Sequence, residues 1–271
     1  MIRGMVSRLA PVGSASRYPP IPWLKEKILK HQDFTTEKKV ALHDFSLYYQ
    51  RPREVIHTYD EIFHKEMYRF DSDNPHPVIL DCGANIGLSV LYFKRLFPGA
   101  ELIAFEPDET NYALLIKNIE INKLSQVTVH KAAVWVKDGK ISFEAGASEG
   151  SSIASGAPAG APVIEVDSMR LAGLLAARQK IDFLKMDIEG AEWDVLMDSA
   201  DYLDRIEHMF IEYHGLTFET AKLADLLTLF DRKGFQVYIR NAADGLVHPY
   251  IERQTGEKYD VQLNMFCYRK K

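Results

Sequence analysis

The chain has 271 residues, of which 46% are hydrophobic and 26% charged, and its formal net charge is −5. This length suffices for one large globular α/β domain, while the acidic balance argues against a general nucleic-acid or anionic-membrane binder. No apolar run approaches the roughly 20 residues that a membrane-spanning helix needs. Cys82 and Cys267 are too few for a disulfide framework, so we interpret them as small buried hydrophobes in a protein of the reducing cytoplasm.

The first quarter of the chain predicts two segments ahead of the main domain. Residues 1–25 contain basic but no acidic side chains, together with many Ser, Gly and Pro residues, which predicts a loose basic N-terminal arm. A cap segment follows over residues 26–77. Within it, residues 40–49 predict a short hairpin strand, residues 59–63 lead into a helix, and the turn-rich residues 71–77 end the segment.

From residue 78 to residue 271, apolar runs alternate with amphipathic stretches. This alternation predicts one domain with a mostly parallel sheet that is covered by helices on both faces. The predicted strands lie at 78–81, 102–105, 181–187, 208–215, 235–240 and 261–268, and residues 127–136 predict one or two more. The predicted helices begin near Leu88, after an N-cap at Asp108, after an N-cap at Asp167, before Val195 and at Thr217.

Two connections in this domain have their own signals. Lys137–Lys140 predicts a hairpin turn into the strand-like residues 141–143. Ala145–Pro162 consists almost wholly of Gly, Ala, Ser and Pro, which predicts a flexible loop within the domain and not a linker between two domains.

The most informative motif is a glycine turn after the first strand of the domain. The apolar run Val78–Leu80 leads into Asp81, and Gly83 and Gly87 follow with the spacing Gly-x-x-x-Gly. Two glycines at a strand-to-helix turn let the backbone approach a ligand closely. About 20 residues further on, the second strand ends in Glu106–Pro107, and an acidic residue at that distance accepts hydrogen bonds from ribose hydroxyls. The two motifs together predict an adenosine-containing ligand.

The spacing of the glycines favours one class of such ligands. A dinucleotide fingerprint needs Gly-x-Gly-x-x-Gly to seat a pyrophosphate, whereas this turn has only Gly83 and Gly87, with Asp81 ahead of them and Asn85 between them. A carboxylate at the mouth of the turn repels a pyrophosphate and suits a ligand with an ammonium and a sulfonium group. We therefore predict S-adenosylmethionine (SAM) over NAD.

A second group of polar residues follows two later strands. Asp187 and Glu189 come directly after one strand, and Glu212 and His214 lie at the end of the next. Because ligands in such sheets bind beyond the carboxyl ends of the strands, we expect these four side chains to converge on the edge that holds the glycine turn. Repulsion among the carboxylates costs stability unless a cation, a proton or a substrate offsets it, which favours a functional site.

Two neighbours of this group have simpler interpretations. Glu192 falls in the first turn of a predicted helix, where a carboxylate complements the helix dipole. Lys185 alternates onto the same strand face as Asp187, so an ion pair or a catalytic role fits it equally.

With these motifs the sequence resembles the FkbM family of SAM-dependent methyltransferases. The resemblance covers roughly residues 78–240 and rests on Val78–Gly87, Phe105–Pro107 and Ile181–Glu192. It implies a Rossmann-like class I methyltransferase fold, with a seven-stranded, mostly parallel sheet, helices on both faces and a reversed last strand. It also implies O-methylation of a hydroxyl on a sugar, glycolipid, polysaccharide or polyketide-like metabolite. N-methylation of a small amine, a nicotinamide-dependent oxidoreductase or epimerase, and a non-catalytic SAM-binding protein are the alternatives.

The resemblance also assigns contacts to the cofactor. The methionine part of SAM falls to the glycine turn, the ribose to the end of the second strand, and the adenine to the residues after the third strand. The implied cofactor-binding residues are Asp81, Gly83, Ala84, Asn85, Gly87, Glu106, Pro107, Ala132 and Ala133.

Methyl transfer to a hydroxyl needs a base or a metal, because a sugar hydroxyl is a poor nucleophile at neutral pH. We predict Asp187 or His214 as the base, oriented by Glu189 and Glu212. In the rival interpretation Asp187, Glu189, Glu212 and His214 hold a divalent ion, and oxygen ligands with one His suit Mg or Mn. The expected partner is a small-molecule or glycan acceptor, and the sequence leaves open whether the chain forms a homo-oligomer.

Overall fold

The computed structural model of the protein describes residues 16–144, 163–243, 246, 248–252 and 258–269. The predicted loop Ala145–Pro162 and the first 15 residues of the predicted N-terminal arm lie outside the described residues.

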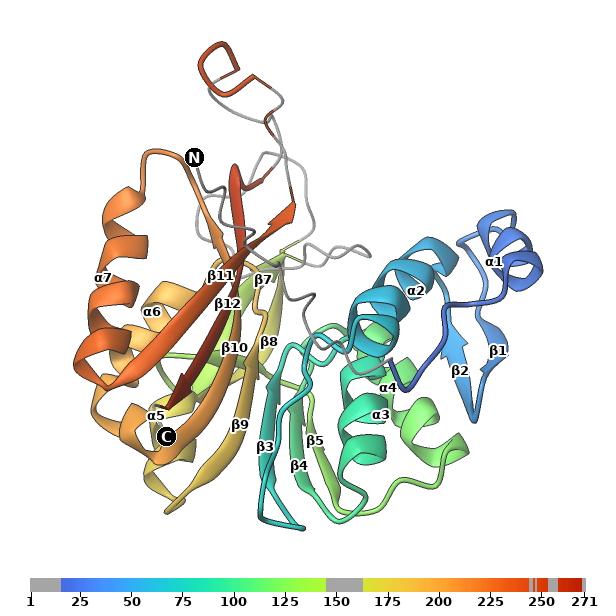
Figure 1. Cartoon of the computed structure of the whole chain (residues 1–271), viewed down its shortest axis with the longest axis horizontal. Helices are drawn as coiled ribbons and strands as arrows, with labels where there is room; N and C mark the ends of the chain where they lie inside the picture. Colours follow the sequence, from blue (N-terminus) through green and yellow to red (C-terminus); the bar gives the residue numbers. More distant parts are fainter. Residues whose placement is uncertain (1–15, 145–162, 244–245, 247, 253–257, 270–271) are drawn as a thin grey trace, which may run out of the picture.

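The central sheet has seven strands in the spatial order β11-β12-β10-β9-β3-β4-β5 (Figure 1). β12 runs antiparallel to both of its neighbours, and the other paired strands are parallel. The predicted seven-stranded, mostly parallel sheet with a reversed last strand is therefore confirmed. The strands are β3 (Val78–Cys82), β4 (Glu101–Phe105), β5 (Val127–His130), β9 (Ile181–Met186), β10 (Ile206–Gly215), β11 (Phe235–Ala243) and β12 (Val261–Arg269).

Helices cover both faces of this sheet, and strand alternation divides the core between them (Figure 1). Ile79 and Phe183 pack into the cluster on the side of α3 and α4, whereas the next residues, Leu80 and Leu184, pack into the cluster on the side of α5, α6 and α7. The helices are α3 (Leu88–Leu96), α4 (Glu109–Ile121), α5 (Leu171–Ala176), α6 (Glu192–Asp198), the 3₁₀ helix η2 (Ala200–Arg205) and α7 (Thr220–Arg232).

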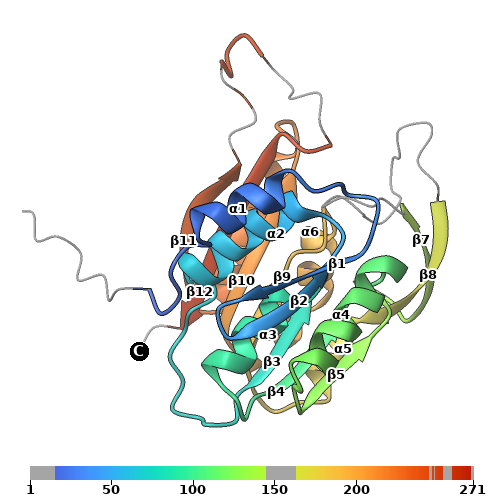
Figure 2. The ribbon, with the colours of Figure 1, turned by 90° about the vertical axis from the view of Figure 1, so that its right-hand side faces the viewer.

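The cap segment shares the first of these cores. It consists of α1 (Trp23–Lys30), the hairpin of β1 (Lys38–Leu42) and β2 (Phe45–Tyr49), α2 (Pro52–Tyr59) and the π-helix η1 (Asp60–His64). Phe63 stacks on Tyr59 with ring centroids 5.2 Å apart and meets Tyr92 of α3 edge-on at 5.5 Å. Residues 40–49, predicted as one strand of a hairpin, instead contain parts of two paired strands with a turn between them, and Figure 2 shows this hairpin in front of α3. The helix expected after residues 59–63 is absent, because α2 and η1 end at His64 and no helix follows in the described residues before β3.

Asn118 of α4 and Asn122, the residue that follows this helix, bind the free edge of the hairpin. The Asn118 side chain accepts from the Tyr48 amide at 2.6 Å and donates to the Tyr48 carbonyl at 2.9 Å. Asn122 makes the same pair of bonds to Ser46, at 3.1 and 2.7 Å. Because each amide side chain offers one donor and one acceptor to the strand, the two residues replace a neighbouring strand. Asn118 also donates to the Ile86 carbonyl at 2.8 Å, so the cap is joined to the glycine turn.

The region around Asp167 differs from the prediction. Asp167 does not cap a helix but lies within β8 (Val163–Arg170), and α5 begins at Leu171. β8 lies between β6 (Ala133–Trp135) and β7 (Gly139–Glu144) in a small sheet of order β6-β8-β7, so the predicted turn at Lys137–Lys140 does not make a hairpin. The β-branched residues before Asp167 favour the strand, and pairing with β7 decides the matter.

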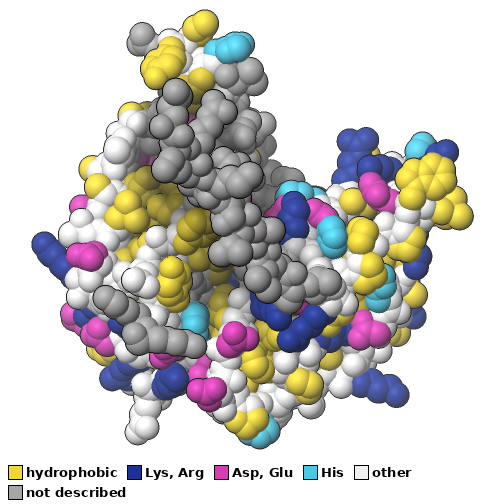
Figure 3. All heavy atoms as spheres, in the orientation of Figure 1, with side chains coloured by type: hydrophobic (Ala, Val, Ile, Leu, Met, Phe, Trp, Pro, Cys, Tyr) yellow, Lys and Arg dark blue, Asp and Glu magenta, His cyan; other side chains and the backbone are white. Residues whose placement is uncertain are grey.

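Several smaller predictions hold in the part of the chain that the structure describes. The Asp108 carboxylate caps α4 by accepting from the amides of Thr110 and Asn111, and both cysteines are buried and free. None of the described helices has the length and apolar character needed to cross a membrane. The outer end of α1 does expose apolar side chains, seen at the far right of Figure 3, where Trp23 is 72% exposed and Leu24 62%.

Candidate active site

A cavity of about 690 Å³ lies at the carboxyl ends of β3, β9 and β10. Its lining includes the glycine turn, through Gly83, Ala84 and Asn85, and all four predicted catalytic residues. α2 and η1 of the cap and the ends of β11 and β12 complete the wall. The sequence placed the glycine turn and the four catalytic candidates at one sheet edge. It did not indicate that the cap and the last two strands face them.

Packing within the protein explains both glycines of the turn. Gly83 has φ +84°, and a Cβ at this position would lie 1.9 Å from the Asp187 carbonyl oxygen. Gly87 has φ +92°, and a Cβ there would lie 2.5 Å from Leu115 Cδ1. Asn85 between them is also left-handed, with φ 49°. The turn is tight because it packs against the end of β9 and against α4, and this packing leaves its backbone along the cavity.

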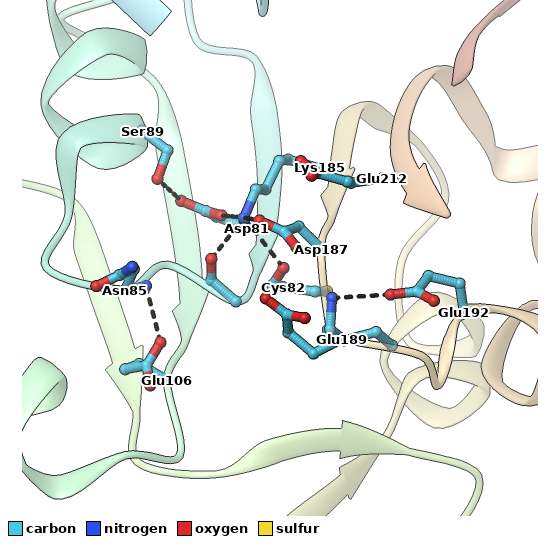
Figure 4. Close-up of polar contacts among 12 residues, drawn as sticks. Asp81, Cys82, Asn85, Ser89, Glu106, Lys185, Asp187, Glu189, Glu192 and Glu212 are labelled. Carbon is cyan, nitrogen blue, oxygen red and sulfur yellow. Dashed lines mark hydrogen bonds and ion pairs between the residues drawn. The ribbon is translucent and has the colours of Figure 1, made fainter. Parts of the chain in front are cut away.

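Glu106 lies beneath this turn (Figure 4). Its carboxylate accepts from the Asn85 amide at 2.8 Å and from the Asp108 amide at 2.9 Å. Burial raises the pKa of Glu106 to about 7, although these two backbone donors act in the opposite direction. Pro107 follows at the start of the connection to α4, and Ala132 and Ala133, after β5, are 4% and 5% exposed.

Asp81 is fully buried and is not part of the cavity lining, but its two side-chain partners, Ser89 and Lys185, are. Ser89 Oγ donates to its Oδ2 at 2.5 Å, and Lys185 Nζ lies 3.7 Å from its Oδ1. Burial raises the pKa of Asp81, against the effect of Lys185. The carboxylate therefore helps to join β3, α3 and β9, and its contact with the methionine part of SAM stays a prediction.

Lys185 connects the two halves of the site (Figure 4). Its buried ammonium donates to the Gly83 carbonyl at 2.5 Å and pairs with Asp187 at 3.4 Å. Burial alone lowers the pKa of Lys185, but the Asp187 and Asp81 carboxylates outweigh it and raise the pKa above its ordinary range. Of the two roles that the sequence left open for Lys185, the ion pair with Asp187 is present, whereas the contact with Asp81 had no signal in the sequence.

Glu192 has a larger role than helix-dipole compensation. It opens α6, is fully buried, and accepts from the Ile188 amide at 3.2 Å and the Gly190 amide at 3.1 Å. The same carboxylate lies 3.3 Å from His214 Nδ1. Glu192 thus closes the turn between β9 and α6 and holds the His214 ring in place.

The four predicted catalytic residues lie together around this ring. His214 Nε2 is 3.7 Å from Glu189 Oε2 and 3.8 Å from Glu212 Oε1. Burial lowers the pKa of His214, but Glu192 and then Glu189 outweigh it and raise the pKa to about 10, which favours the imidazolium form of the ring. Burial raises the pKa of Glu189 and Glu212 above the ordinary range of a glutamate.

The site carries an excess of negative charge. Among the residues that the structure describes, five carboxylates face two cationic side chains, Lys185 and His214. The carboxylates are Asp81, Asp187, Glu189, Glu192 and Glu212. Burial raises the pKa of Asp81, Glu189 and Glu212, so protons offset part of this excess, and a cationic ligand beside the cluster would offset more of it.

Comparison with known proteins gives this site a family. A family model described as "Methyltransferase FkbM domain" matches residues 81–237. Methyltransferase 1 of Beauveria bassiana is 28% identical over 228 residues, which cover 75% of this chain and 90% of that protein. The 2-O-methyltransferase NoeI of Sinorhizobium fredii is 28% identical over 164 residues, which cover 52% of this chain and 65% of that protein.

Solved structures are also similar in outline. The crystal structure of methyltransferase FkbM from Methylobacillus flagellatus aligns with a TM-score of 0.48 and 20% identity, over 76% of this chain and 47% of that one, so the match spans about half of its length. TYW2 of M. jannaschii, in complex with AdoMet, aligns with a TM-score of 0.48 and 13% identity over 88% of both chains.

The family match begins at Asp81 and includes the glycine turn, Glu106 and the Asp187–Glu212 region. It covers more than half of the chain, and the strand order of the sheet agrees with the fold that the motifs implied. The chain therefore belongs to the FkbM methyltransferase family and is a SAM-dependent methyltransferase with a Rossmann-like class I fold.

Proposed function

We propose that this methyltransferase acts on a hydroxyl group of a sugar or of another polyhydroxylated acceptor, free or in a glycan, glycolipid or polyketide-like metabolite. The observation that carries the proposal is the cluster of Asp187, Glu212 and His214, whose ligand atoms all lie within 4.8 Å of one another in the cavity beside the glycine turn. A hydroxyl must lose its proton during transfer, and this cluster holds the groups that can take it. The name of NoeI, a 2-O-methyltransferase, supports the same reaction class.

The residues at the ends of β3 and β4 suit SAM. When bound, SAM supplies a methyl group on a positively charged sulfur. Each Glu106 oxygen uses one backbone donor and keeps a lone pair for a ribose hydroxyl. Gly83, Ala84 and Asn85 would lie along the methionine part, with Gly87 shaping the turn. Pro107, Ala132 and Ala133 would lie beside the adenine ring of SAM. The negative excess of the cluster favours a cationic cofactor over a pyrophosphate.

A carboxylate is a better candidate for the base than His214. The imidazolium form of His214 has no free lone pair, and Glu192 and Glu189 favour that form because they raise the pKa of the ring. Burial and the nearby Asp187 raise the pKa of Glu212, so this group acts as a base only after it loses its own proton, and its ionised form is then a stronger base than an ordinary glutamate. We therefore propose that Glu212, or Asp187 beside it, removes the proton, while Lys185 and His214 orient the carboxylates.

A metal-assisted version has support from the same geometry. Three ligand atoms within 4.8 Å of one another match a site that a divalent ion completes with water or substrate oxygens. Glu189, 3.7 Å from His214 Nε2, is close enough to join such a site. In this version Mg or Mn offsets the carboxylates and lowers the pKa of the acceptor hydroxyl.

Transfer of labelled methyl from SAM into fractionated host extract, with and without EDTA, tests these proposals. We expect label in sugar-containing products with the native protein and none with Asp187→Asn. The exposed control Asp231→Asn should label as the native protein does. Loss of label with EDTA and its return with Mn would support the metal version. An unchanged amount of label in the presence of EDTA would support the carboxylate base. Label found only in amines or protein would reject O-methylation.

A further inference from the structure

A row of polar side chains crosses the sheet from the catalytic cluster to the edge strand. Glu212 of β10 pairs directly with Asn264 of β12, and Asn264 pairs directly with Arg240 of β11. Directly paired residues present their side chains on the same face of a sheet, and all three residues line the cavity. Neighbouring strands lie about 4.8 Å apart, so Glu212 and Arg240 are separated by about 10 Å across two strand spacings.

Asn264, in the middle of the row, has an unused acceptor. The residue is 8% exposed, and its Oδ1 is buried without a hydrogen-bond partner among the described residues. Its Nδ2 has only a weak contact with Met67 Sδ, at 3.7 Å. Buried polar atoms in native proteins are nearly always hydrogen-bonded. Because the oxygen is closed off from solvent, a hydroxyl of a molecule in the cavity would supply the missing donor once the Asn264 side chain turns toward it.

Arg240, at the outer end of the row, is a cation without a carboxylate partner among the described residues. Its guanidinium instead lies over the Phe266 ring, 4.7 Å from the centroid. This contact holds the planar group in one orientation and leaves its N–H groups for a ligand.

The other cations of the cavity wall are already paired. Lys65 forms ion pairs with Asp60 and Glu61 at 2.9 and 2.5 Å. Lys185 is held by Asp187, as His214 is by the glutamates. Arg240 therefore differs from the rest of the wall, because it is positioned by packing and not by an opposite charge.

We propose that the acceptor carries an oxyanion, a carboxylate or a phosphate, which Arg240 binds two strands away from Glu212, while Asn264 on the strand between them accepts a hydrogen bond from a hydroxyl of the acceptor. This inference rests on the proposed O-methylation and narrows its substrate to acidic sugars, sugar phosphates or similar hydroxy acids. A guanidinium binds both kinds of oxyanion through paired N–H groups.

Binding of three probes, followed by ligand-observed NMR, tests the proposal without turnover. The probes are glucuronate, glucose 6-phosphate and glucose, each added to the native protein, to Arg240→Gln and to Arg232→Gln. Arg232 is exposed at the end of α7, outside the cavity lining, and serves as the matched control. We expect at least one anionic probe to bind the native protein and Arg232→Gln about tenfold more tightly than glucose, and Arg240→Gln to abolish the difference. The probe that binds more tightly than glucose shows whether the site prefers a carboxylate or a phosphate.

Equal affinities of the three probes for the native protein, or no binding by any of them, would overturn the proposal. A second arm separates this failure from failure of the proposed function. The labelled product of methyl transfer in extract is applied to an anion-exchange column, where we expect retention and an acceptor KM about tenfold higher for Arg240→Gln. A labelled product that is not retained leaves O-methylation standing and rejects the oxyanion, whereas label only in amines rejects the proposed function itself.

Discussion

The two walls of the active site are built in different ways. The wall at the ends of β3 and β4 is made mainly of backbone, with three residues at positive φ and a Glu106 carboxylate that accepts from main-chain amides. The wall at the ends of β9 and β10 is made of side chains that hold one another through charge. The first therefore depends on conformation and packing, and the second on electrostatics. We expect damage to the first to appear as unfolding or weaker cofactor binding, and damage to the second as slower methyl transfer.

The largest effect should follow Gly83→Ala. The added Cβ would lie 1.9 Å from the Asp187 carbonyl oxygen at a φ of +84°, so the variant must move β9 or the turn, at a cost of at least about 3 kcal/mol in the free energy of unfolding. Urea unfolding measures this cost. Gly173→Ala is the control, because nothing lies within 4 Å of its Cβ, and it should leave stability unchanged or increase it by up to about 1 kcal/mol. Equal stability of the two variants would show that packing does not demand a glycine at position 83.

Asp187→Asn should have the next largest effect, on rate. We expect kcat to fall by about 10²-fold or more, because the variant removes a charge that faces Lys185 at 3.4 Å and the acceptor cavity. SAM should still bind, as measured by calorimetry. Methyl transfer at the native rate by Asp187→Asn would contradict both the proposal of a carboxylate base and the proposal of a divalent metal ion.

Glu106→Gln should weaken SAM binding and leave the rate of methyl transfer nearly unchanged, which is the opposite of the result expected for Asp187→Asn. The amide keeps one acceptor for the backbone donors of Asn85 and Asp108, but it loses the charge that strengthens hydrogen bonds to ribose hydroxyls. We expect the Kd of SAM to rise about tenfold, with kcat at saturating SAM near the native value. A fall in kcat without a change in Kd would contradict the division between the two walls.

The smallest effect should be a shift in pH dependence in Glu192→Gln. The folded pKa of His214, about 10, lies above its unfolded value of about 6.5. The stability that the protonated ring supplies is therefore fully present below about pH 6.5 and is lost as the pH rises through about 10. Without the Glu192 charge the folded pKa falls, so this loss should occur at lower pH. Urea unfolding at a series of pH values, with NMR titration of the His214 ring, measures the shift, and superimposable curves for the two proteins would argue against it.

Much of this architecture was predictable because its signals are local. The strands of the sheet are short apolar runs, the Asp108 cap precedes its helix directly, and the glycine turn follows its strand. Convergence of Asp187, Glu189, Glu212 and His214 was also predictable, because carboxyl ends of parallel strands meet at one edge. Asp167 was misassigned for the converse reason: its role depends on pairing with β7, and a cap and a strand residue look alike in sequence.

By itself, the sequence determined the class of fold, the edge of the sheet that carries the site and the residue types gathered there, since strand periodicity and turn chemistry are properties of neighbouring residues. Only the tertiary structure decided which side chains touch and in which charge state. The pair of Lys185 with Asp81 joins residues 104 positions apart in the chain, and the raised pKa of His214 follows from Glu192, which opens α6, and from Glu189 in the turn between β9 and α6. The polar row from Glu212 to Arg240 exists because a reversed β12 sets its register between β10 and β11. Distances and burial of this kind arise from packing across the whole domain, and they control the electrostatic interactions on which the chemistry depends.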